Sequence, residues 1–140
     1  MELEKDYEEM INNEEVELVF SVRMGERYDD AHYIVLFYKN EEEFVIEYYA
    51  VDYMSSYSYT TSKEEAIELF LESITAAFDY ISHFDCDYEQ QELIRRYYAE
   101  CIFDGLDNVK YFHKEYADLI EKYEDKLLGY IKEYYPKETE

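Results

Sequence analysis

Thirty-six acidic residues are balanced by only thirteen basic ones in this chain of 140 residues, which gives a formal charge of −23 at pH 7. Like charges at this density repel one another in any compact state, so folding requires a large apolar core to offset the repulsion. The composition supplies one, because 48% of the residues are hydrophobic and 19% are aromatic. We therefore expect a single globular domain over residues 1–140, and not a disordered acidic tail.

The acidic residues are concentrated in the first three quarters of the chain. Residues 1–62 carry 16 acids and 4 bases, residues 63–108 carry 12 acids and 3 bases, and residues 109–140 carry 8 acids and 6 bases. Such a charge repels nucleic-acid phosphates and anionic membranes, and it attracts basic partners over long range. We expect no direct binding to nucleic acid or to membranes, and we place any specialised surface within residues 1–108.

The compartment is expected to be the cytoplasm. The sequence has no run of 18 apolar residues, and its first ten residues lack the basic and apolar regions of a signal peptide. Disulfides persist in oxidising compartments, so Cys86 and Cys101 are expected to be reduced thiols.

The hydrophobic pattern changes period along the chain. A helical stripe predicts a helix over residues 2–13, and the Asn12–Asn13 pair suits its end because asparagine tolerates a left-handed backbone. Three strands are predicted over residues 16–24, 32–39 and 44–54, and their short connections imply antiparallel pairing. Residues 55–62 are expected to form a loop or a short edge strand.

Three helices are predicted after residue 62. Two N-terminal caps and one C-terminal glycine mark their ends: Ser62 with Glu65, Asp87 with Gln90, and Gly105. The last helix is expected over residues 109–135, about 40 Å long, and to be stopped by Pro136. Its far end would reach past the core and offer a surface for a homodimer. The predicted fold class is α+β: a three-stranded antiparallel sheet, an N-terminal helix and three C-terminal helices that cover one face, the last one long.

Motifs for catalysis and cofactor binding are missing from the sequence. The three glycines are scattered singly, so neither a phosphate-binding loop nor a nucleophile elbow is present. His83 and Cys86, with His113 or Cys101, are the nearest approach to a zinc site, but the same segment fits a helix end and a cap. Asp85, Asp87 and Glu89 alternate as in a calcium loop without its glycine and distal glutamate. We expect a protein that is not an enzyme and holds no metal or cofactor.

Tyrosine is the second unusual feature, with 19 residues and doublets at 48–49, 97–98 and 134–135. Neighbouring residues cannot share one face, so at least one member of each doublet should be partly exposed. Tyr57 and Tyr59 lie in a serine- and tyrosine-rich segment whose composition is typical of binding loops. The alternative is that tyrosine simply replaces phenylalanine and leucine in a chain that must stay soluble.

The acidic residues also have two interpretations. A charge magnitude of roughly 2–8 is enough to keep a small domain soluble, and this chain far exceeds it. Carboxylates along a strand or one helical turn apart can imitate the row of phosphates that basic grooves recognise. The candidate partner-binding residues are Asp29, Asp30, Glu41, Glu42, Glu43, Tyr57, Tyr59, Glu64, Glu68, Glu72, Asp85 and Asp87.

In its acidity and in the order helix, three strands, helices over residues 2–104, the chain resembles the small acidic inhibitors encoded by phages, including DNA-mimic anti-CRISPR proteins. The resemblance implies a non-enzymatic inhibitor that occupies the nucleic-acid groove of a basic nuclease or of a CRISPR effector such as Cas9. Two alternatives remain open: an immunity protein or antitoxin that neutralises one toxin, and a small-molecule-binding protein with a tyrosine-lined pocket.

Overall fold

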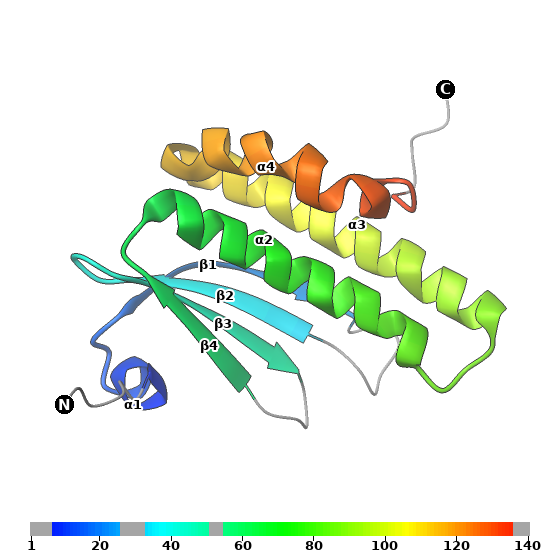
Figure 1. The fold of residues 1–140 in the computed structure, drawn as a ribbon, viewed down its shortest axis with the longest axis horizontal. Coiled ribbons are helices and arrows are strands. Elements are labelled where there is room, and N and C mark those ends of the chain that lie inside the picture. Colours follow the sequence, from blue (N-terminus) through cyan, green and yellow to red (C-terminus); the bar gives the residue numbers. More distant parts are fainter. Residues whose placement is uncertain (1–6, 26–32, 51–54, 136–140) are drawn as a thin grey trace.

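A computed structural model describes residues 7–25, 33–50 and 55–135 of the chain. The elements follow one another in the order drawn in Figure 1: α1 (Tyr7–Asn12), β1 (Glu17–Met24), β2 (Tyr33–Lys39), β3 (Phe44–Ala50), β4 (Ser55–Thr60), α2 (Lys63–Asp79), the 3-10 helix η2 (Tyr80–His83), α3 (Tyr88–Phe112) and α4 (Lys114–Lys132). The fold is mixed α+β, as predicted.

The sheet has four strands in the order β1-β2-β3-β4, all antiparallel. The prediction of three strands is one strand too few, because the serine- and tyrosine-rich segment, expected to be a loop or a short edge strand, forms β4 at the sheet edge. Its residues alternate between the two faces. Tyr59 is exposed on the outer face, while Thr60 is buried and its hydroxyl donates to Glu65 Oε1 at 2.6 Å. This alternation lets a polar segment pair with β3 while anchoring the start of α2.

The inner face of the sheet carries the main core. Aromatic and branched side chains from β1, β2 and β3 alternate inward and pack against α2 and α3. Phe20 stacks on Phe37 with ring centroids 4.5 Å apart, and Phe70 of α2 meets Phe20 edge-on at 5.1 Å. The pairing of β1 with β2 shifts between Leu18 and Phe20, and after this irregularity Phe20, Val22 and Met24 lie on the inner face.

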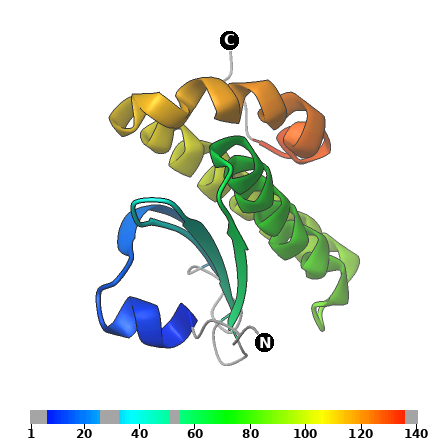
Figure 2. The same ribbon diagram turned by 60° about the vertical axis from the view of Figure 1, so that its left-hand side comes forward.

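The two faces of the sheet are covered differently (Figure 2). The helices α2 and α3 cover the inner face, and α4 packs on both of them. The short helix α1 lies on the outer face, where Met10 and Ile11 pack against a small cluster of Val16, Tyr38 and Val45. The expectation that all helices cover one face therefore holds for the three C-terminal helices and fails for α1.

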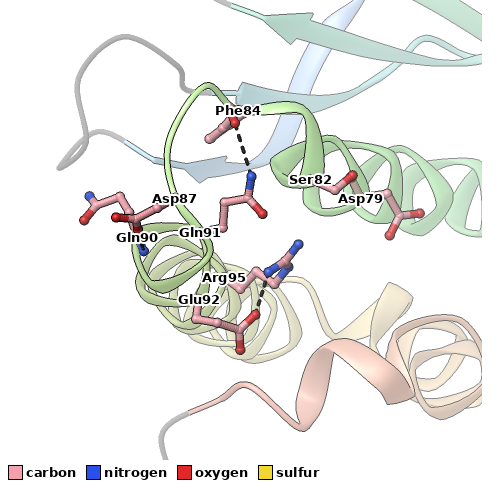
Figure 3. Close-up of polar contacts among 8 residues, drawn as sticks. All are labelled: Asp79, Ser82, Phe84, Asp87, Gln90, Gln91, Glu92 and Arg95. Atoms are coloured by element: carbon pink, nitrogen blue, oxygen red, sulfur yellow. Dashed lines mark hydrogen bonds and ion pairs between the residues drawn. The ribbon is translucent and has the colours of Figure 1, made fainter.

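Both predicted helix caps are confirmed. The Ser62 hydroxyl accepts from the backbone N–H of Glu65 at 3.1 Å, and Asp87 Oδ1 accepts from the N–H of Gln90 at 2.8 Å. In the connection between α2 and α3, Gln91 also donates to the carbonyl of Phe84 at 3.2 Å (Figure 3). These local bonds fix the direction in which α3 leaves the end of α2.

The predicted end of α3 and start of the last helix are wrong. Gly105 lies inside α3 because α3 crosses β1 there, and a Cβ at Gly105 would come within 3.3 Å of Val22. The break falls instead at His113, whose ring lies 5.4 Å from that of Phe20. Because the chain turns there, Tyr116 is buried against the sheet. A straight helix over residues 109–135 would carry Tyr116 away from the core. At 19 residues, α4 spans about 28 Å and folds back over α2 and α3, so the reason for expecting a homodimer through this helix is lost.

Tyrosine hydroxyls and lysines bind carboxylates where α4 meets its neighbours. Tyr130 donates to Asp79 Oδ1 at 2.7 Å, and Tyr135 just after α4 donates to Asp104 Oδ1 at 2.8 Å. Within the same interface Lys110 pairs with the mostly buried Glu124 at 2.9 Å. Each of these bonds gives an acidic side chain a donor, and the ion pair with Lys110 also neutralises the charge of Glu124.

Tyrosine hydroxyls that are buried or bonded to carboxylates predict a loss of stability in alkaline solution. The bond to Asp104 is the main cause that raises the pKa of Tyr135 to about 12, and burial raises the pKa of Tyr48 to about 12, from the ordinary value of 10. A raised pKa means that the fold favours the neutral hydroxyl. The stabilisation is therefore complete below pH 10 and is lost as the pH rises from 10 to about 12.

We expect the thermal midpoint, followed by circular dichroism, to fall steeply over this interval. The variant Tyr135→Phe should be less stable than the parent at neutral pH and should lose less between pH 10 and 12, because its ring cannot ionise. The exposed Tyr88 provides a control, and Tyr88→Phe should follow the parent chain. If the thermal midpoint of the parent and of Tyr135→Phe fell equally between pH 10 and 12, ionisation of Tyr135 would not be a cause of the loss.

Candidate functional site

Two acidic segments meet at one end of the sheet, at the left of Figure 1. Glu14, Glu15 and Glu17 precede and begin β1, and residues 41–43 form the turn between β2 and β3. Antiparallel pairing places Glu17 opposite Lys39, which brings the two segments together. We call this surface the acidic end and define it by Glu14, Glu15, Glu17, Glu41, Glu42 and Glu43. Its side chains line two shallow hollows of about 500 and 590 Å³.

The turn between β2 and β3 is held by its backbone and by Asn40. The Oδ1 atom of Asn40 accepts from the backbone N–H groups of Glu42 and Glu43 at 3.0 and 2.9 Å. The N–H of Asn40 donates to the carbonyl of Glu43 at 3.0 Å. The side chains of Glu41 and Glu42 take no part in these bonds and are exposed, so the turn presents carboxylates from a fixed backbone.

The segment between α1 and β1 has a left-handed residue at Glu14, with φ of 60°. The N–H of Glu14 donates to Ile11 and that of Glu15 donates to Met10, at 3.0 and 2.8 Å, which is the Schellman pattern of a helix end. Glycine is usual at this position, because an L-residue there costs on the order of 1 kcal/mol. We predicted that asparagine would supply the left-handed residue, and the chain instead keeps a glutamate there.

Negative charge at the acidic end is poorly compensated. Within the part of the chain that the structure describes, Glu14, Glu15, Glu17, Glu41 and Glu42 form no ion pair. Lys39 lines the same surface and is its one basic side chain among the described residues. Three basic residues elsewhere form internal ion pairs: Arg95 with Glu92, Lys110 with Asp107 and Glu124, and Lys122 with Glu64. The acidic end therefore presents a negative potential that the fold itself does not neutralise.

Four of the predicted partner-binding residues meet here. Glu41, Glu42, Glu43 and Tyr59 line the same hollow. Tyr57 lies on the same strand as Tyr59, two residues before it and therefore on the same face, and is half-buried. The aromatic and acidic parts of the prediction thus share one surface.

The other predicted acids lie elsewhere or have internal contacts. Glu64 accepts hydrogen bonds from Lys122 at 2.8 Å and from Tyr123, and the bond from Lys122 is the main cause that lowers the pKa of the Glu64 carboxyl. Glu68 is half-buried on the same helix, and Glu72 is exposed.

Asp85 and Asp87 lie in the connection between α2 and α3, at the opposite end of the molecule from the β2–β3 turn (Figures 1 and 3). The carboxylate of Asp87 caps α3. Asp29 and Asp30 fall outside the described residues.

Three acids of the site were missed by sequence reasoning, namely Glu14, Glu15 and Glu17. The information that could have found them is the antiparallel pairing of the first two strands, which was predicted. In such a pair the start of the first strand lies beside the end of the second, so these acids must adjoin the 41–43 turn.

Two further observations concern metals and membranes. Over residues 7–25, 33–50 and 55–135, no three side chains of the His, Cys, Asp and Glu types come together as metal ligands. In the same ranges, no helix has the length and apolar character needed to cross a bilayer. Of the residues considered for zinc, His83 packs its ring 5.1 Å from that of Tyr80, and Cys86 is a half-buried thiol.

Comparison of the chain with protein-family models, with curated proteins and with solved structures found no match.

The strained glutamate yields a direct prediction. Replacing Glu14 with glycine should raise the free energy of unfolding by about 0.5–1 kcal/mol, because it relieves the left-handed strain and removes one like charge. The matched control is Glu15→Gly, which removes the same charge at an ordinary backbone position and should not stabilise the chain. Urea unfolding of both variants measures the difference. Equal effects of the two substitutions would show that strain at Glu14 is not significant.

Proposed function

We propose that the chain is a non-enzymatic inhibitor that binds a basic nucleic-acid-binding protein by presenting carboxylates in place of phosphates. The target class is a nuclease or a CRISPR effector such as Cas9. The observation that supports this most strongly is the acidic end, where six glutamates from two segments gather around a fixed turn.

The physical basis is the same as that of phosphate recognition. Basic grooves bind nucleic acid mainly through lysine and arginine contacts to a regular row of negative charge. A protein can occupy such a groove if its carboxylates are uncompensated and held in place before binding, since little ordering entropy is then lost. Both conditions are supported at the acidic end, because five of its six glutamates form no ion pair among the described residues and the Asn40-centred turn holds Glu41 and Glu42.

The strain at Glu14 also supports a binding role. Residues held in an unfavourable backbone conformation tend to occur where function needs the side chain. Glycine would serve the helix end better, and a carboxylate is present instead. The amide of Asn40 and the hydroxyls of Tyr59 and Thr61 also line the surface, and they can bind the rim of a basic groove by hydrogen bonds.

The test is capture and displacement. The chain is immobilised, incubated with a bacterial lysate at low ionic strength, and then washed with double-stranded DNA or with RNA before bound proteins are identified by mass spectrometry. We expect basic nucleic-acid-binding proteins to be retained and then released by the polynucleotide. A partner that saturating DNA and RNA both fail to displace would contradict mimicry and favour an immunity protein or antitoxin.

A matched pair of variants separates the acidic end from bulk charge. The triple variant Glu15→Gln, Glu41→Gln, Glu42→Gln neutralises the acidic end, and Asp118→Asn, Asp125→Asn, Glu133→Gln removes the same charge from exposed positions on and just after α4. The first should weaken the captured complex by about tenfold or more, and the second should change it little. Equal losses would mean that net charge alone drives the binding.

A further inference from the structure

Another hollow, of about 430 Å³, lies away from the acidic end, between the end of α2, the start of α3 and the end of α4. Aromatic side chains from all three helices form its walls, with the buried Phe78 on α2, Tyr88 on α3, and Tyr130 and Tyr134 on or near the end of α4. Tyr88 is 71% exposed and Tyr130 is 45% exposed, so two rings of this wall are available to a partner. We call it the aromatic hollow.

The charged groups of the aromatic hollow are two carboxylates and one guanidinium. Figure 3 shows Glu92 and Arg95 side by side on α3, with Asp79 and Ser82 at the end of the neighbouring helix. Arg95 pairs with Glu92 one turn away, at 2.5 Å, and its side chain is only 14% exposed. The guanidinium is therefore already neutralised within α3 and is largely covered.

Asp79 is the second carboxylate of the aromatic hollow, in addition to Glu92. Its Oδ1 atom accepts the hydroxyl of Tyr130 at 2.7 Å, and the Ser82 hydroxyl donates to the Asp79 carbonyl at 3.0 Å. No lysine or arginine among the described residues pairs with this exposed carboxylate. The contact with Tyr130 fixes the position of the carboxylate beside the Tyr130 ring without neutralising it.

We infer that the aromatic hollow binds an arginine side chain of a basic partner protein. A guanidinium stacks on tyrosine rings and is attracted by their negative faces, and it pairs well with a carboxylate. The exposed rings of Tyr88 and Tyr130 and the carboxylate of Asp79 provide these contacts within one hollow. An anionic ligand is disfavoured, because Arg95 is engaged by Glu92 and the whole chain carries a charge of −23.

The inference rests on the proposed function for the identity of the partner, since a protein with a basic groove presents arginines along the groove and on its rim. It adds a contact at the end of the molecule opposite the acidic end (Figure 1). One partner that touches both would be held at two places, which fixes its orientation.

The test uses a small probe and therefore does not depend on the macromolecular partner. N-acetyl-arginine amide is titrated into the full chain with labelled tyrosine rings, and nuclear magnetic resonance follows the ring signals, assigned by single Tyr→Phe variants. We expect saturable shifts of Tyr88, Tyr130 and Tyr134. The neutral N-acetyl-glutamine amide should leave these signals unchanged.

Two substitutions and one control complete the experiment. Asp79→Asn keeps an acceptor for Tyr130 and should weaken binding of the arginine probe about threefold to tenfold, and Tyr88→Ala should do the same without touching the core. The control Asp125→Asn, an exposed acid of α4, should have no effect.

Non-saturating shifts, equal shifts with the glutamine probe, or unchanged affinity in both Asp79→Asn and Tyr88→Ala would each overturn the inference. If the arginine probe binds as expected but DNA and RNA do not displace the captured partner, the proposed function is overturned. The aromatic hollow would then still be an arginine site.

Discussion

The structure depends on hydrogen bonds from tyrosine hydroxyls to carboxylates. With 36 acids and only 13 bases, the chain cannot neutralise its interior contacts by ion pairs alone. Tyrosine supplies a donor without adding charge, and its ring contributes apolar area to the same contact. Tyr130 to Asp79 and Tyr135 to Asp104 tie α4 and the residues after it to α2 and α3, while Tyr38 donates to Glu47 across the sheet at 3.0 Å. Tyr38, Tyr130 and Tyr135 therefore contribute both ring packing and a donor to a carboxylate in this strongly acidic protein.

The same interaction divides the acids into two groups. Acids that meet a tyrosine or a lysine, such as Glu64 and Glu124, serve the packing of the helices. At the acidic end, Glu14, Glu15, Glu17, Glu41 and Glu42 form no ion pair among the described residues, and the backbone bonds to Asn40 hold the turn that carries Glu41 and Glu42. A chain selected only for solubility would spread its unpaired charge evenly. Here two segments far apart in the sequence bring it together, which is why the acidic end is the better candidate for recognition.

Much of the fold follows from local sequence patterns. Alternation predicted β1, an apolar run predicted β2, and the acidic turn after it predicted β3. The caps at Ser62 and Asp87 were also located correctly, because all these features depend on neighbouring residues. The errors have tertiary causes. Gly105 resembles a helix end in sequence and in fact gives α3 room to cross Val22, and the break at His113 depends on burying Tyr116 against the sheet. For the site, the 41–43 turn was found as a run of acids, whereas Glu14 to Glu17 required strand pairing, and the aromatic hollow required the placement of three helices.

The central claim is that the carboxylates of the acidic end replace phosphates in a basic groove. It is tested most directly by the salt dependence of the dissociation constant for the captured partner, measured for the parent chain and for the variant with Glu15, Glu41 and Glu42 changed to glutamine. If these carboxylates occupy phosphate positions, affinity should fall steeply with salt for the parent, and the slope of log Kd against log salt concentration should become clearly shallower in the variant. Identical slopes for the two chains would contradict the claim.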